Sequence, residues 1–143
     1  MSFKHHKNII PVMTRRFATT ASITIAVGDL LAMEATGLCE RAAANDASIL
    51  GIAAEAKASS DAAETPILVH VIRSSDIILA DATVTSPAQA DVGEEIDIVD
   101  HASVDVGASS NDECIVYGLF GTATDKVLVH FNPDYLFMET GAI

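Results

Sequence analysis

The sequence is poor in aromatic residues and in long apolar runs, and each shortage excludes a class of protein. Aromatic residues make up 5% of the 143 residues and tryptophan is absent, so neither a base-stacking surface nor an aromatic platform for sugars has enough material. No apolar run approaches the ~20 residues of a membrane-spanning helix. The length fits one domain of roughly 100–200 residues with at most an arm, which excludes a multi-domain enzyme.

Cysteine is also scarce, and the two that are present, Cys39 and Cys114, lie far apart in apolar stretches. We expect both to be free, buried thiols in a protein that assembles in a reducing compartment. A disulfide between them is the alternative.

Metal-binding patterns are weak. A possible zinc set lacks the short ligand spacing of zinc sites; it comprises His70, His101, His130 and Cys114. An acidic cluster lacks the alternating acids and glycine of a calcium loop, and we expect it to be a solvated turn and strand face; it comprises Asp91, Glu94, Glu95, Asp97 and Asp100. We predict neither a metal nor a cofactor.

The charge is split along the chain. The net charge is −12, and no acidic residue precedes Asp29. Residues 1–28 carry four basic residues and residues 29–143 carry four basic against 20 acidic ones. Such an acidic body repels nucleic acid and anionic membranes, whereas the basic start is attracted to acidic protein surfaces. A solvated tail is the alternative, and an export signal around Arg15-Arg16-Phe17 lacks a convincing cleavage site.

From Ser22 onward, Val- and Ile-rich runs are separated by turn residues at intervals of about 8–12 residues, which is typical of an all-β barrel or sandwich. Within Ile67–Arg73, the side chains of Ile67, Val69 and Val71 alternate with others, the period of a half-buried strand. Residues 38–63 are rich in alanine and allow one or two short helical turns. The runs predict strands at Ile23–Val27, Leu30–Met33, Ile49–Ala54, Ile67–Arg73, Ile77–Ala80, Ile96–Val99, Cys114–Phe120 and Val127–Phe131.

The first 21 residues lack this alternation and mix Pro11 with basic residues and threonine. They predict an extended arm, residues 1–21, before a single β-rich body, residues 22–143. We expect the arm to be disordered in the isolated protein, and deletion of residues 2–20 to leave the body folded.

Sequence signatures of catalysis are missing. The nearest approach to a Gly-x-Ser-x-Gly nucleophile elbow is Val106–Ser110, which lacks the second glycine. Neither Gly-x-Gly-x-x-Gly nor Gly-x-x-x-x-Gly-Lys occurs, so no phosphate-binding loop is evident. We predict that the protein is not an enzyme.

The run Ala47–Glu55, followed by a polar loop and the strand Ile67–Arg73, resembles the central part of head decoration (cement) proteins of tailed bacteriophages, as does Val27-Gly28-Asp29-Leu30 upstream. These proteins show a Gly-Asp turn, a strand, an Ile-x-Gly-x-Ala-like strand and a Val-rich strand behind an N-terminal arm. The resemblance covers residues 26–100, and the carboxyl-terminal third has no counterpart.

The resemblance implies a β-tulip-like barrel that forms a homotrimer on the outer surface of the virion capsid. It also implies assembly in the host cytoplasm, binding to the major capsid protein and stabilisation of the expanded shell. The arm would contribute the capsid contacts through Ile9, Ile10, Val12, Arg15, Arg16 and Phe17. A small-ligand or glycan-binding β-barrel is the alternative function.

Overall fold

The computed structural model describes residues 2–7 and 11–140 and is mainly β, with 43% of residues in strands and 7% in helices. The strands form two antiparallel sheets, which confirms the all-β prediction. In spatial order, the six-stranded sheet contains β1 (Phe3–Lys7), β7 (Ile77–Asp81), β11 (Lys126–Phe131), β10 (Cys114–Leu119), β8 (Glu95–Ile98) and β9 (Val104–Asp105). The five-stranded sheet contains β2 (Met13–Ala18), β6 (Pro66–Val71), β5 (Ile49–Ala53), β3 (Leu30–Met33) and β4 (Cys39–Arg41).

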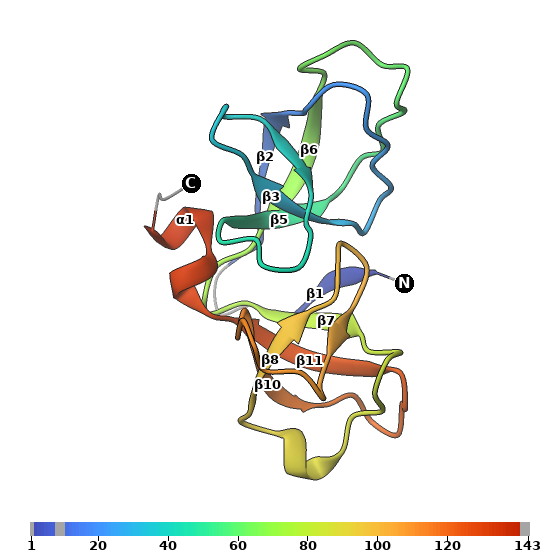
Figure 1. Ribbon diagram of the computed structural model, residues 1–143, viewed down its shortest axis with the longest axis vertical. Coiled ribbons are helices and arrows are strands. Elements are labelled where there is room, and N and C mark those ends of the chain that lie inside the picture. Colours follow the sequence, from blue (N-terminus) through green and yellow to red (C-terminus); the bar gives the residue numbers. More distant parts are fainter. Residues whose placement is uncertain (1, 8–10, 141–143) are drawn as a thin grey trace.

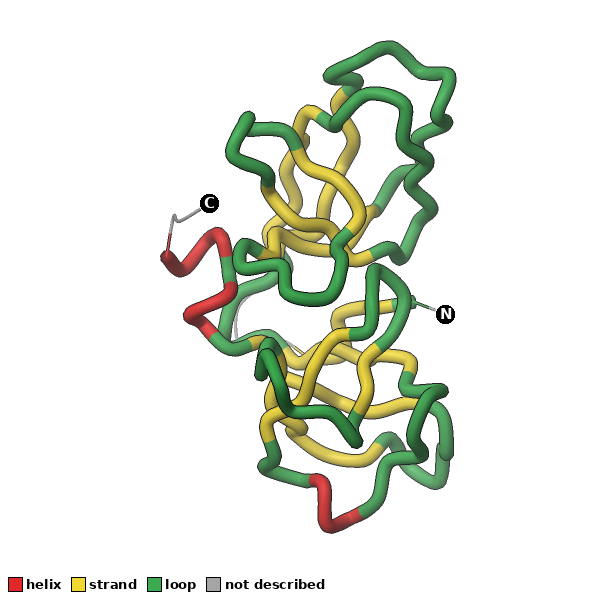
Figure 2. The backbone as a smooth tube through the Cα atoms, in the orientation of Figure 1, coloured by secondary structure: helices red, strands yellow, loops and turns green. Residues whose placement is uncertain are grey.

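The two sheets occupy the two halves of an elongated molecule (Figure 1). Long loops surround the strands, and the helical segments are short (Figure 2). These segments are η1 (Gln89–Asp91), η2 (Pro133–Tyr135) and α1 (Phe137–Thr140), so the turns allowed within residues 38–63 are absent there and occur elsewhere in the described chain. Among the described residues, no helix has the length and apolarity needed to cross a bilayer.

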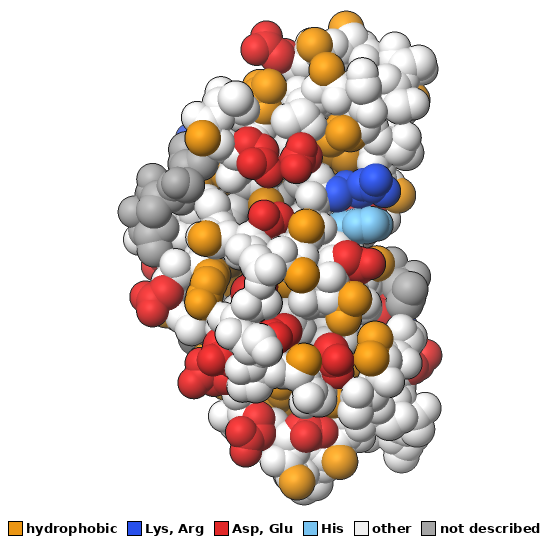
Figure 3. Space-filling model, viewed as in Figure 1, with side chains coloured by type: hydrophobic (Ala, Val, Ile, Leu, Met, Phe, Trp, Pro, Cys, Tyr) orange, Lys and Arg blue, Asp and Glu red, His pale blue; other side chains and the backbone are white. Residues whose placement is uncertain are grey.

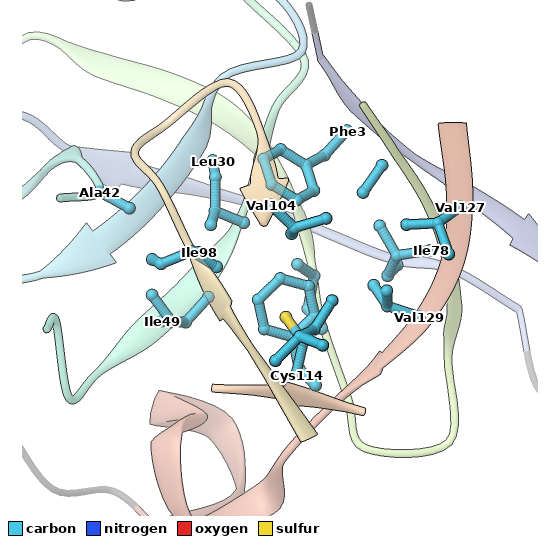
Figure 4. Packing of buried hydrophobic residues seen from close by; sticks show 14 of the residues in the cluster. Phe3, Leu30, Ala42, Ile49, Ile78, Ile98, Val104, Cys114, Val127 and Val129 are labelled. Atoms are coloured by element: carbon cyan, nitrogen blue, oxygen red, sulfur yellow. The ribbon is translucent and has the colours of Figure 1, made fainter. Parts of the chain in front are cut away.

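Two hydrophobic cores hold the fold together. The larger lies between the sheets and includes Leu30 and Ile49 from the five-stranded sheet and Ile78 and Val129 from the six-stranded sheet (Figure 4). The smaller lies within the five-stranded sheet and includes Leu31. Neighbouring residues of β3 therefore point into different cores, which explains why the whole strand is apolar and buried rather than alternating.

The five-stranded sheet curls until its two edges meet. Thr19, directly after β2, forms a parallel bridge to Cys39 of β4, and the Thr20 N–H donates to the Cys39 carbonyl at 3.0 Å. This contact gives that half of the molecule a barrel-like closure. Strand β6 contributes Ile67, Val69 and Val71 to the inside, as the alternation predicts.

Most predicted strands are present, but Ile23–Val27 is not one of them. Only Ile25 pairs, in an isolated bridge to Lys57. The chain turns already at Ala26, whose N–H donates to Asp29 Oδ2 at 2.9 Å, and Gly28 has a φ of 95° that favours glycine. The short strands β4 and β9 were not predicted.

The expectation of an N-terminal arm outside the body is corrected by the structure. Strand β1 pairs with β7, and β2 pairs with β6 over six consecutive residues. Phe3 is 1% exposed and belongs to the larger core. Strands β1 and β2 are not predicted from the sequence, because histidine, lysine and arginine occupy positions where an alternating pattern would place apolar residues. Deletion of residues 2–20 would remove one edge strand from each sheet. The expectation that the body stays folded after this deletion is therefore wrong.

Candidate functional site

The described residues among those predicted for capsid contact lie in different surroundings. Ile9 and Ile10 lie outside the described residues. Arg15 and Arg16 are exposed on β2, and Arg16 Nη1 donates to Glu55 Oε1 at 2.8 Å. Phe17 packs against the smaller core and is engaged within the protein.

Val12 lines a groove between the two halves. The groove has a volume of about 340 Å³ and lies where β1 faces β5 and β6, beside the turn at Val27. Its walls are largely apolar, with two imidazole rings among them. The lining residues are Phe3, Lys4, His5, Val12, Val27, Gly28, Ile52, Ala53, Ala54 and His70.

A buried carboxylate, that of Asp76, organises one end of this region. Asp76 is 0% exposed, and its Oδ2 lies 3.2 Å from His5 Nε2. The Arg73 guanidinium donates to the same carboxylate through Nε at 3.4 Å and Nη2 at 3.3 Å. Arg73 Nη2 also donates to the Pro11 carbonyl at 2.6 Å. The Asp76–Arg73 pair thus connects the β6–β7 turn to both β1 and the segment that precedes β2.

Each histidine in this region has a hydrogen-bond partner. His70 Nδ1 lies 3.0 Å from the Thr14 hydroxyl, and His130 Nδ1 lies 3.1 Å from the Asp76 backbone carbonyl. Burial lowers the pKa of His5 and outweighs the neighbouring Asp76 carboxylate, which raises it. Sequence reasoning missed His5 and Asp76 because nothing in the pattern links residues so far apart in the chain.

The residues considered for zinc lie in separate environments. Cys114 is buried in the larger core, whereas His70 bonds to Thr14 and His130 to the Asp76 carbonyl. Within the described parts of the chain, no three His, Cys, Asp or Glu side chains are grouped so that they could hold a metal ion.

Cys39 and Cys114 are free and buried, which confirms the thiol prediction and contradicts the alternative of a disulfide. Cys39 belongs to the smaller core and Cys114 to the larger. Burial raises the pKa of Cys39 to about 11 and raises that of Cys114 well above its ordinary value. Because the thiolate is the nucleophilic form, both side chains are inert packing residues at neutral pH.

Asp97, predicted to lie on a solvated face, is instead 6% exposed. Its carboxylate accepts hydrogen bonds from the backbone N–H groups of Ser110 at 2.8 Å, Asn111 at 2.8 Å and Asp112 at 2.7 Å. Burial raises the pKa of this carboxyl, but the three N–H donors outweigh it and the net pKa is lowered. Asp97 therefore anchors the loop between β9 and β10.

Replacing Asp97 by alanine is expected to cost about 2–3 kcal/mol of stability, because three loop N–H groups lose a charged acceptor. The folded-state pKa is depressed, so this stabilisation is present above the unfolded pKa and is lost as pH falls through the folded value. Urea unfolding at pH 7 and in acid would measure both effects. Glu95→Ala, at an exposed position of the same strand, is the matched control, and equal stability of the two variants at pH 7 would contradict the anchoring role.

Acidic side chains dominate the surface. On the face in Figure 3, Asp and Glu are spread over both halves, whereas Lys and Arg gather mainly in one patch beside a His side chain. Arg15 and Arg16 of β2 and Arg41 of β4 are exposed on a protein whose net charge is −12.

Neither a family model nor a curated protein matches this chain.

Proposed function

We propose that this protein is a structural virion protein, a head decoration or cement protein that binds the outer surface of a phage capsid as a homotrimer. In this role it is not an enzyme; it assembles in the host cytoplasm, contacts the major capsid protein and stabilises the expanded shell. Binding the shell but not its dissociated subunits would stabilise the shell by mass action.

One observation carries the proposal. The segments that resemble decoration proteins form one contiguous unit, β3, β5 and β6, which are neighbours in the five-stranded sheet. The glycine of the Ile-x-Gly-x-Ala-like run is Gly51, where an added Cβ would collide with the His70 carbonyl oxygen of β6. The sequence pattern therefore corresponds to a specific packing requirement rather than to scattered similar residues.

The proposed capsid contact is the exposed part of β2 with the preceding Val12. Arg15 and Arg16 are available to acidic groups of a shell, although Arg16 must then share or leave its pairing with Glu55. Exposed ion pairs of this kind contribute about 0–1 kcal/mol each and are screened by salt.

Co-sedimentation of the purified chain with expanded phage heads tests the proposal. We expect binding, and we expect Arg15→Ala/Arg16→Ala to weaken it by up to about thirtyfold, the equivalent of two exposed pairs. Added salt should weaken the wild type in the same way. Arg41→Ala, which removes an exposed arginine from β4, is the control for a general loss of positive charge.

Absence of binding to any expanded head would contradict the proposed function. Equal binding by the double variant and the wild type would retain the function and move the contact elsewhere. The groove of about 340 Å³ is the observation that favours the alternative, a small-ligand module, because it has an apolar wall with a few polar groups. Failure to bind heads, together with a small molecule that copurifies with the chain, would support that alternative.

A further inference from the structure

Strand β1 lies at the edge of the six-stranded sheet and pairs only with β7. Phe3 holds its beginning: the ring lies in the larger core, 6.1 Å from the Phe131 ring centroid, and the N–H donates to the Gly28 carbonyl at 3.0 Å. His5 holds its middle, since the side chain points the same way as Phe3 and is 8% exposed. The ladder to β7, the contact between Ser2 and Asp81 and the His6–Phe120 ring contact also attach this segment. Of these attachments, the His5–Asp76 contact is the one whose partner is a buried carboxylate beside a histidine.

The carboxylate nearest to His5 is that of Asp76, and it already has a cationic partner. Asp76 already accepts from the Arg73 guanidinium through both carboxylate oxygens, and from the Arg73 backbone N–H at 3.0 Å. Protonation of His5 would place a second cation beside the same buried anion. Because the guanidinium already compensates the carboxylate, the added charge gains less than it would from a free carboxylate.

Among the described residues, the other side chains that meet His5 or Asp76 come from β6 and β11 and carry no carboxylate. From β6, the His70 ring meets the His5 ring edge-on, with centroids 6.2 Å apart, and Thr14 of β2 binds His70. From β11, His130 reaches the Asp76 backbone carbonyl and not its carboxylate. Besides burial, the neighbouring His70 lowers the pKa of His5.

Burial thus opposes the charged form of His5 more strongly than Asp76 favours it, and the pKa of His5 lies below its ordinary value near 6.5. The unfolded or detached strand binds the proton more readily than the folded one. Attachment of β1 therefore weakens as pH falls through 6.5 toward the folded-state pKa.

We propose that the contact between His5 and Asp76 is an acid-sensitive latch, which releases strand β1 from β7 when His5 is protonated. Release exposes the backbone edge of β7 and withdraws Phe3 from the core, while β2 stays paired with β6. The inference does not depend on the proposed function, because it concerns the isolated chain.

Hydrogen exchange of the full chain, followed by mass spectrometry at about pH 7.5 and about pH 5.5 and corrected for intrinsic rates, tests the latch. We expect the protection of the amides of residues 3–7 to fall at least about fivefold in acid, with β2 amides unchanged. His5→Gln, which keeps a donor for Asp76 but cannot be protonated, should abolish the change. His70→Gln, the matched control, should retain most of it.

Protection of the β1 amides that stays constant in acid would overturn the proposal. Protection that increases in acid would also overturn it, because the ion pair between protonated His5 and Asp76 would then strengthen the attachment of β1. Equal loss in wild type and His5→Gln would do the same. Should His5→Gln fail to fold, the ring-proton resonances of His5 in the wild type decide the question. A titration midpoint at or above 6.5 would contradict the latch.

Discussion

Replacing Phe3 by alanine is expected to destabilise the protein by about 3–5 kcal/mol, the usual cost of removing a buried aromatic ring. The ring is 1% exposed and packs near Phe131 in the core between the sheets. Chemical denaturation measures the loss. Lys4→Ala, at the exposed neighbouring position of the same strand, is the matched control and should change stability little.

The burial of Phe3 also affects the interpretation of a chain that lacks residues 2–20. A chain without residues 2–20 lacks β1 and β2, so loss of capsid binding by that chain would report loss of the fold. If Phe3→Ala proved as stable as Lys4→Ala, the N-terminal strand would not belong to the core. The arm predicted from the sequence would then stand.

Replacing Gly51 by alanine is expected to cost at least about 3 kcal/mol, the upper end of the range for overpacking. The added methyl group would meet the His70 carbonyl oxygen of β6, and it would lie 2.9 Å from both Val69 Cγ1 and Val71 Cα. Backbone atoms of a paired central strand cannot move aside without breaking the β5–β6 ladder.

Gly118→Ala provides the control for Gly51. Gly118 is also a strand glycine, but an added Cβ there meets nothing within 4 Å. The substitution should be neutral or slightly stabilising in thermal unfolding, because alanine restricts the unfolded chain. Equal unfolding temperatures for the two variants would show that β5 and β6 are less closely packed than described, and would weaken the packing argument for the decoration-protein resemblance.

The strands predicted from the sequence are those whose side chains carry the signal themselves. Strand β6 alternates apolar and other residues, and β3 and β5 are apolar throughout because cores lie on both of their faces. Strand β1 carries one apolar residue, Phe3, among lysines and histidines, so its place in the sheet depends on contacts with distant segments: the buried Phe3 ring, the His5–Asp76 contact and pairing with β7. These contacts join residues far apart in the chain, so no local sequence pattern indicates them.

In the candidate site, too, some features follow from the local sequence and others depend on contacts between distant residues. Arg15 and Arg16 are exposed, as their charge would lead one to expect, but they lie on a paired strand rather than on the predicted arm. The meeting of His5 with Asp76 was not, because it joins the first strand to a turn in the middle of the chain. The prediction for Asp97 was wrong for a similar reason. An acidic residue between two isoleucines indicates a solvent-exposed strand face, but the loop between β9 and β10 covers this side chain.

Strands β1 and β2 have a consequence for how the chain matures during synthesis. They leave the ribosome well before their partners β7 and β6, which lie later in the chain. Until then neither strand has an edge to join, and the lysines and arginines among their apolar residues keep the waiting segment from pairing with a neighbouring nascent chain. The six-stranded half can close only after β11 has been made, because β11 lies between β7 and β10 in that sheet and joins the β1–β7 pair to the remaining strands.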